Sequence, residues 1–317
     1  MIRIGNDART LYEVLTANLK VVILCLACLA LSACAVRLSP PTLSHRYTYG
    51  PTTTINYEVH GNGDRSLVFL HGFGASLETW RDIQPLLAAH YTLFLLDLKG
   101  FGRSSKPKDN RYTTDDQAAI VTQFVQDVVK GNLTFVGNSF GGAVALKAYL
   151  RLRNTSAVDR LVLIDAAAYH QAIPWFVRLL RWPIINHAVF LMPATTRASM
   201  VLHKTFADDG KVTDERVRRH AQFLDLPGAH HALRKTAKAL VPNDDFAQQI
   251  AGIDASTLVL WGKQDEIIPV SNAQRFMADL KHAQLILLDH TGHAPQEENP
   301  HATATAIIEF LSQDSTR

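Results

Sequence analysis

The stretch Leu133–Gly142, which reads LTFVGNSFGG, decides how this chain is interpreted. Its first four residues form an apolar run typical of a buried strand, and an Ala-rich helical run follows over 143–152. Between them, Gly-x-Ser-x-Gly predicts a sharp turn from strand to helix with Ser139 at its tip. Gly137 and Gly141 have no Cβ atoms, so strand and helix can approach closely there. We therefore expect the Ser139 hydroxyl to be lifted clear of the sheet.

The composition is that of a globular protein. The 317 residues are 47% hydrophobic and 19% charged, with a net charge of +3. This length suits one large domain or a domain with an insertion, and the small net charge argues against nucleic-acid binding. All three cysteines lie near the N-terminus, at positions 25, 28 and 34, so the body of the protein is predicted to have no disulfide.

The first 33 residues are interpreted as a signal peptide. Val21–Ala33 is an apolar run that is short for a membrane span and suited to a signal-peptide core. Leu31–Cys34 resembles the bacterial lipobox, in which the cysteine is lipidated and becomes the first mature residue. The resemblance implies a lipid anchor on Cys34, a tether over 34–45 and a place in the bacterial cell envelope, at the outer membrane if the host is Gram-negative. The alternative is a coincidental cysteine near the end of an ordinary signal or short anchor.

From residue 46 onward, apolar strands alternate with helical segments. This pattern predicts the α/β class, with a mostly parallel central sheet covered by helices on both faces. An edge hairpin over 47–58, with its turn at Gly50-Pro51, precedes the alternation. The expected strands are 66–70, 91–96, 133–136, 161–165, 257–261 and 285–288, and the expected helices are 77–87, 114–129, 143–152, 272–280 and 299–311.

One interval, 169–254, interrupts the alternation. It shows no strand pattern, and its short helical runs are broken by prolines at 174, 183, 193, 227 and 242. We interpret it as a helical lid inserted into a core formed by 46–168 and 255–317.

Several lid residues have both a functional and a structural interpretation. Trp175, Arg178 and Arg181 lie in an apolar segment that suits an acyl pocket or a membrane interface, or else a helix packed on the core with its arginines solvated. The arginines at 216, 218 and 219 are interpreted as a solvated helix face. The pair His230-His231 lacks partners at ligand spacing, so no metal site is predicted.

A serine nucleophile needs a base, and a carboxylate that orients the base. Both should follow later strands of the sheet, because the loops after parallel strands meet at one edge. Asp265 follows the strand 257–261, and His293 follows the strand 285–288. The rivals are His290 as the base, and Glu266 and Asp165 as the acid.

Five motifs, in this order along the chain, resemble those of the α/β-hydrolase superfamily. They are His71–Gly74, Asp97–Ser104, Gly137–Gly142, Trp261–Asp265 and Gly292–Pro295. The resemblance implies an α/β-hydrolase fold from about residue 47 to the C-terminus, with an inserted lid.

The resemblance also implies the roles of the site residues. Ser139 would attack a carbonyl carbon, His293 would act as general base and then general acid, and Asp265 would hold the imidazole. The main-chain amides of Phe73 and Phe140 would bind the oxyanion, and no cofactor would be needed. The side chain of His71 is expected to be structural.

A serine at position 139 favours ester chemistry, since an aspartate there would have signalled a dehalogenase or an epoxide hydrolase. We therefore expect a hydrolase of small-molecule or lipid esters, similar to an esterase or lipase. The GNSFGG sequence also resembles hydrolases that cleave carbon–carbon bonds in ring-fission products. Those enzymes usually carry Trp after the histidine, where this chain has Ala294, and they use a lid arginine, for which Arg178 or Arg181 is available. A third alternative is a non-catalytic binding protein on the same fold.

Overall fold

The computed structural model describes residues 44–155, 157–240 and 244–313. The predicted signal peptide, Cys34 and nearly all of the predicted tether lie outside these residues. Everything below concerns the compact unit that begins at Ser44.

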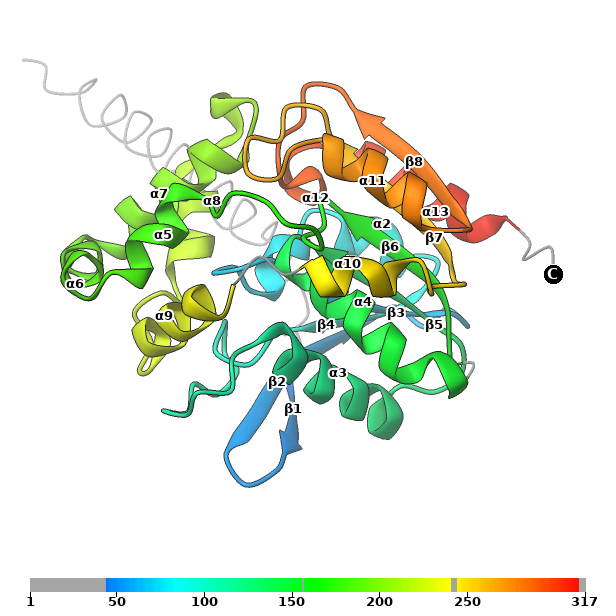
Figure 1. The fold of residues 1–317 in the computed structure, drawn as a ribbon, viewed down its shortest axis with the longest axis horizontal. Helices are drawn as coiled ribbons and strands as arrows, with labels where there is room; N and C mark the ends of the chain where they lie inside the picture. The colour runs from blue at the N-terminus through cyan, green and yellow to red at the C-terminus, as the bar shows by residue number, and fades with distance from the viewer. Residues whose placement is uncertain (1–43, 156, 241–243, 314–317) are drawn as a thin grey trace, which may run out of the picture. The chain divides into compact units, whose positions relative to one another are not determined.

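An eight-stranded sheet with the order β1-β2-β4-β3-β5-β6-β7-β8 forms the centre of this unit (Figure 1). β1 pairs with β2, and β2 with β4, in antiparallel fashion, and the pairs from β4 to β8 are parallel. The expected hairpin and all six expected strands are present. The strands are β1 Ser44–Tyr49, β2 Thr53–His60, β3 Ser66–Leu70, β4 Thr92–Leu96, β5 Leu133–Asn138, β6 Val158–Ile164, β7 Ser256–Gly262 and β8 Ala283–Leu288.

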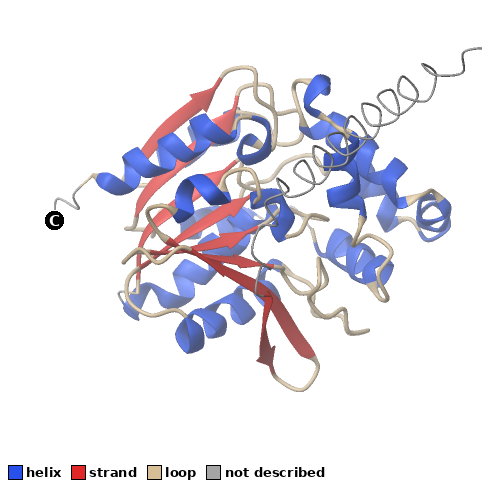
Figure 2. Cartoon of the chain, turned by 180° about the vertical axis from the view of Figure 1, so that it is seen from behind, coloured by secondary structure: helices blue, strands red, loops and turns tan. Residues whose placement is uncertain are grey.

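Helices cover both faces of the sheet, because successive strand residues point to opposite sides. In β3, Val68 and Leu70 pack in the cluster that includes α3, α4 and α11. Leu67 and Phe69 pack in the opposite cluster, which includes η1, α2 and α13. Figure 2 shows this layering from behind. The helices are α3 Thr114–Val128, α4 Phe140–Leu152, α11 Ser271–Asp279, the 3-10 turn η1 Leu77–Trp80, α2 Gln84–Ala88 and α13 Pro300–Ser312.

The helix expected over 77–87 is wrong in one respect: it is split into η1 and α2. Pro85 lies in the first turn of α2, where its missing N–H costs nothing, and in a continuous helix it would clash with the preceding turn. The apolar residues of both pieces still face the sheet, so the predicted buried face is correct although the predicted continuous helix is not.

Six helices lie between β6 and β7, and within the described part of this interval there is no strand. They are α5 Trp175–Arg181, α6 Pro183–Leu191, α7 Ala194–Thr205, α8 Asp214–Ala221, α9 Ala229–Ala239 and α10 Asp244–Ile250. We call this segment the insertion. Three short elements complete the chain: η2 Arg153–Thr155, η3 Asp209–Lys211 and α12 Pro295–Glu298. Across the residues that the structure describes, none of the helices has the length and apolar character needed to cross a bilayer.

The turn from β5 to α4 depends on close backbone packing. A Cβ atom on Gly141 would lie 2.0 Å from the carbonyl oxygen of Leu70, and one on Gly137 would lie 2.6 Å from the carbonyl oxygen of Gly141. Real Cβ atoms do not approach backbone oxygens this closely, so only glycine fits both positions.

We therefore predict that Gly141→Ala destabilises the protein by about 3 kcal/mol or more, because α4 would have to move away from β3. Gly131→Ala is the matched control. Gly131 has a φ of 75° but no atom within 4 Å of an added Cβ, so its cost should be only the strain of the left-handed backbone, about 1 kcal/mol. Urea unfolding of both variants checks this, and equal losses would contradict the packing argument.

Candidate active site

Ser139 occupies a strained turn between β5 and α4. Its φ of 55° and ψ of −121° lie in a region that residues other than glycine rarely adopt, at a typical cost of about 1–3 kcal/mol. Neighbouring backbone fixes it there. Its N–H donates to the carbonyl of Ile164 at 3.0 Å, and its carbonyl accepts from the N–H groups of Gly142 and Ala167, both at 2.9 Å. The expected geometry of the motif is therefore present.

His293 and Asp265 are brought together as the sequence predicts. The Nδ1 of His293 lies 2.7 Å from Oδ2 of Asp265, and both side chains are buried. Oδ1 of Asp265 accepts from the N–H groups of Ile267 and Ile268 at 2.7 and 2.9 Å. Backbone amides of its own loop thus fix the carboxylate, and the carboxylate in turn fixes the imidazole.

The main chain of His293 is fixed from two sides. Asn138, next to Ser139, donates through Nδ2 to the carbonyl of His293 at 3.1 Å and to that of Ile164 at 3.1 Å. The N–H of His293 donates to the carbonyl of Thr205, at the end of α7, at 2.7 Å. Asn138 was not singled out from the sequence, although its place inside the Gly-x-Ser-x-Gly motif was a local signal that it sits at the site.

Glu298 is a second residue that sequence reasoning missed. Its Oε2 accepts from the N–H of Gly292 at 2.6 Å, and its Oε1 accepts from the N–H groups of Ala207 and Asp208 at 2.9 and 2.8 Å. This buried carboxylate therefore joins the histidine loop to the insertion. Two of its partners, Ala207 and Asp208, are backbone amides far away in sequence, so no local pattern indicates that it joins the two segments.

Asp165, the rival acid, lies beside Asp265 at the end of β6. One oxygen of each carboxyl group and one ring nitrogen of His293 lie within 4.8 Å of one another; among the described residues this is the one such trio able to hold a metal ion. Oδ1 of Asp165 accepts from the N–H of Gly262 at 3.0 Å, and Oδ2 has no donor in this part of the chain. Burial, and then the charge of Asp265, raise the pKa of Asp165 well above its ordinary value. The protonated, uncharged form of Asp165 is therefore favoured beside Asp265.

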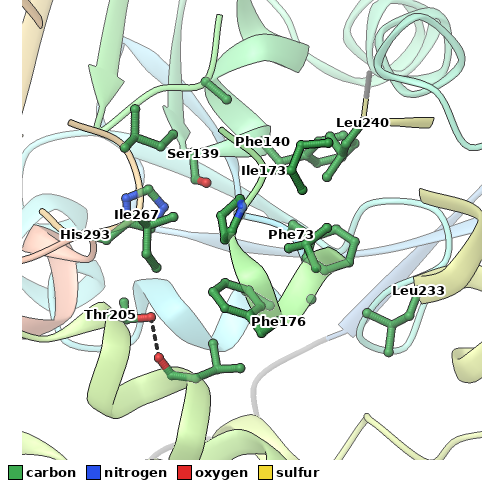
Figure 3. Close-up of a pocket in the computed structure, with 18 of the residues that line it drawn as sticks. Phe73, Ser139, Phe140, Ile173, Phe176, Thr205, Leu233, Leu240, Ile267 and His293 are labelled. Atoms are coloured by element: carbon green, nitrogen blue, oxygen red, sulfur yellow. Dashed lines mark hydrogen bonds between the residues drawn. The ribbon is translucent and has the colours of Figure 1, made fainter. Parts of the chain in front are cut away.

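A cavity of about 770 Å³ lies over these groups, a size typical of small-molecule sites. Ser139, His293, Phe73 and Phe140 all line it (Figure 3). Phe140 begins α4, so its N–H has no acceptor within the helix. The loop of Phe73 reaches the serine, since a Cβ on Gly72 would lie 3.3 Å from Cβ of Ser139. The remaining wall is mostly apolar and comes largely from the insertion, including Ile173, Phe176, Leu233 and Leu240, with Ile267 added from the loop after β7.

The two lid arginines predicted as substrate contacts do not line this cavity. Trp175 lines it, but Arg178 and Arg181 lie along a separate, shallow depression with Trp182. In α5 the buried residues are Val177 and Leu180, and Arg178, which is exposed, lies on the side opposite Leu180; Arg181 is the last residue of the helix.

The interpretation of the arginines at 216, 218 and 219 as a solvated helix face also needs correction. Arg216 and Arg219 pair with Asp82 and with the buried carboxylate of Glu297. Burial alone would raise the pKa of Glu297, but the adjacent His220, Thr79 and Arg219 lower it to about 2. Glu297 and His220 both line the cavity, so this ion cluster forms one of its walls.

The other rivals are excluded by their positions. His290 is exposed and does not line the cavity, and Glu266 is an exposed partner of Lys204. His71 is buried, and burial lowers its pKa to about 4. Its Nδ1 donates to the carbonyl of Gly72 at 2.8 Å, and its Nε2 accepts from the N–H of Leu98 at 3.0 Å. His71 therefore connects two loops, as expected of a structural residue.

The fold and this site define the class of protein. A family model described as the alpha/beta hydrolase fold matches residues 65–300. The chain belongs to the α/β-hydrolase fold family.

Comparisons with known proteins give its similarities within that family. It is 31% identical to the 2-hydroxy-6-oxo-6-(2'-aminophenyl)hexa-2,4-dienoic acid hydrolase of Metapseudomonas resinovorans, over 82% of this chain and 89% of that protein. It is 25% identical to a 2-hydroxy-6-oxononadienedioate/2-hydroxy-6-oxononatrienedioate hydrolase of Escherichia coli, over 83% of this chain and 93% of that one. Among solved structures, the 2-hydroxy-6-oxo-6-phenylhexa-2,4-dienoate hydrolase from Rhodococcus sp. strain RHA1 has a TM-score of 0.73 at 23% identity, covering 86% of this chain and 99% of that one. These names fit the carbon–carbon bond alternative better than ester hydrolysis.

The raised pKa of Asp165 predicts a pH-dependent stability. The folded protein binds this proton more tightly than the unfolded chain does, so the wild type loses stability as the pH rises above the ordinary carboxyl pKa of about 3.9. Asp165→Asn keeps a neutral donor beside Asp265 and cannot ionise. Relative to the wild type, its free energy of unfolding should therefore increase between about pH 5 and pH 8, measured by urea titration.

The control is Asp289→Asn at an exposed carboxylate, whose pKa is lowered by Lys263. That carboxyl group is ionised in both states throughout this range, so the control should show no such increase. Parallel pH curves for Asp165→Asn and the wild type would mean that Asp165 is already charged in the folded protein.

Proposed function

We propose that this protein is a serine hydrolase that attacks the carbonyl carbon of an uncharged carboxylic ester. The observation that supports this most directly is the strained Ser139, which shares one apolar cavity with the hydrogen-bonded pair of His293 and Asp265.

The mechanism follows from these groups. His293 takes the proton of Ser139 as the hydroxyl oxygen bonds to the carbonyl carbon, and the carbonyl oxygen becomes an oxyanion. The N–H groups of Phe73 and Phe140 stabilise that charge. The imidazolium, held by Asp265, then protonates the leaving alcohol, and an acyl-serine forms. A water molecule, deprotonated by His293, hydrolyses the acyl-serine and restores the hydroxyl.

The charges around the cavity favour an uncharged substrate. Lys147 and Arg197 line the cavity, but each is already paired, with Asp115 and Asp225 respectively. A substrate carboxylate would therefore meet cations whose charge is already balanced by a neighbouring carboxylate. The position after His293 holds the small Ala294, which leaves room for an apolar acyl or alcohol group.

A second candidate is the hydrolysis of a carbon–carbon bond next to a ketone in a dienoic acid. Its support is the whole-chain similarity to the dienoic acid hydrolases of Metapseudomonas resinovorans and Escherichia coli. The name of the Metapseudomonas resinovorans enzyme gives its substrate an aminophenyl group. The apolar cavity suits an aryl group of this kind. The serine, the base and the oxyanion donors would be shared by both reactions.

The nucleophile is tested by covalent labelling. We expect a fluorophosphonate probe to label the wild type and not Ser139→Ala, because the probe reacts only with an activated serine. His293→Ala and Asp265→Asn should each lower kcat/KM by about ten-thousandfold. Thermal melting of every variant controls for folding. A folded wild type that stays unlabelled would indicate a binding protein instead of an enzyme.

The substrate class is tested by direct competition. We expect p-nitrophenyl esters whose acyl groups carry no charge to be cleaved with a higher kcat/KM than 2-hydroxy-6-oxo-6-phenylhexa-2,4-dienoate. We also expect a rise in kcat/KM from acetyl to a medium-chain acyl group, since the cavity wall is apolar. A preference for the dienoate over every ester would establish the second candidate and overturn the first.

A further inference from the structure

The insertion exposes an unusual amount of apolar surface. Of the eight large hydrophobic side chains that are exposed among the described residues, six belong to α5–α7 or to the turn between α5 and α6. They are Trp175, Trp182, Ile184, Ile185, Leu191 and Met200. Scattered apolar residues are normal on a protein surface, whereas a cluster of this kind marks a binding surface.

Helix α6 is the centre of this cluster. It buries a polar residue and exposes apolar ones: Asn186 is 1% exposed, whereas Ile184 and Leu191 are 85% and 86% exposed. This is the reverse of the pattern of a helix that packs on a core. Figure 1 shows α6 at the outer edge of the insertion, away from the sheet. We define the apolar face as Trp182, Ile184, Ile185 and Leu191.

Positive charge borders the apolar face. Arg178 and Arg181 of α5 line a shallow depression together with Trp182. The surrounding sequence contains no acidic residue between Asp165 and Asp208. Whatever covers this face must therefore accept apolar side chains and supply negative charge at their border.

We propose that the apolar face docks on the surface of an anionic lipid bilayer. A short helix that lies in the interface, with apolar residues directed into the acyl region and arginines at the headgroups, has this composition. Tryptophan is favoured at the same depth, and Trp182 is the most exposed tryptophan, at 63%.

A second copy of the chain fits the surface less well. In a symmetric pair the same face meets itself, so Arg178 and Arg181 would meet other residues of this segment. Within 166–207 there is no carboxylate to pair with them.

The position of the cavity gives the docking a consequence. Trp175 and Met200 are exposed and also line the cavity, and α6, which carries most of the apolar face, lines it through Val189 and Phe190. A bilayer against this face would supply apolar substrate to the mouth directly. Ten residues, 34–43, separate the apolar run Val21–Ala33 from Ser44, and an extended chain of that length spans about 35 Å. If that run or a lipid on Cys34 enters a membrane, the domain is kept within reach of it.

The full-length chain allows a direct test by fluorescence. It has four tryptophans, of which Trp80 and Trp261 are fully buried. In a Trp175→Phe background, Trp182 is then the one tryptophan that lipid-borne quenchers can reach. We expect phosphatidylcholine vesicles with phosphatidylglycerol to shift its emission to the blue, and lipids brominated near the headgroup to quench it.

Two sets of variants test the face itself. Ile184→Asp with Leu191→Asp should abolish the quenching, while Leu226→Asp, at an exposed apolar residue outside the face, should leave it unchanged. Arg178→Gln with Arg181→Gln should weaken partitioning several-fold on anionic vesicles and much less on neutral ones. All variants should keep the melting temperature of their parent.

Three outcomes would overturn the proposal. Vesicle binding without quenching of Trp182 would mean that the N-terminal segment attaches the protein while the face stays in water. Protection of Trp182 without lipid, increasing with protein concentration, would identify a second copy as the partner. Equal quenching in the Trp175→Phe parent and in the same background with Ile184→Asp and Leu191→Asp would place the contact elsewhere. None of these readouts depends on the proposed esterase activity.

Discussion

The site depends on one backbone contact, the packing of α4 against the end of β3. Because a Cβ on Gly141 would lie 2.0 Å from the carbonyl oxygen of Leu70, the helix can start this close to the sheet only with glycine. The chain then has a single residue in which to reverse from β5 into α4, and Ser139 takes that place. Its hydrogen bonds to Ile164 and Ala167 hold the strained conformation. The position of the hydroxyl is therefore set by the main chain before any residue of the cavity wall contributes.

Four buried carboxyl groups surround the histidine loop, and their partners differ. Asp265 and Glu298 accept hydrogen bonds from backbone amides, whereas Glu297 faces cations, which lower its pKa. Asp165 receives one amide and otherwise faces the negative charge of Asp265, and therefore keeps its proton. A neutral acid behind Asp265 avoids repulsion between two buried charges in contact with His293.

The sequence was sufficient to predict features that depend on residues close together in the chain. The strands, the Gly-x-Ser-x-Gly turn and the order of Ser139, Asp265 and His293 follow from short motifs and periodicity. It was insufficient where the outcome depends on distant partners. The directions of Arg178 and Arg181 depend on which face of α5 the cavity covers, and the burial of Glu298 depends on amides that arrive from the insertion. Nothing in the described residues addresses the predicted lipidation of Cys34, which stays a prediction.

The attachment of the histidine loop to the insertion limits how the cavity can open. The N–H of His293 is bonded to Thr205, and Glu298 joins Gly292 to residues 207–208. A swing of the whole insertion as one rigid flap would pull the imidazole out of alignment with the nucleophile. Helices α5 and α6 make none of these bonds, so a displacement of these two helices would leave the histidine loop in place. The wall of the cavity thus has one part that is tied to the reacting groups and another that is not.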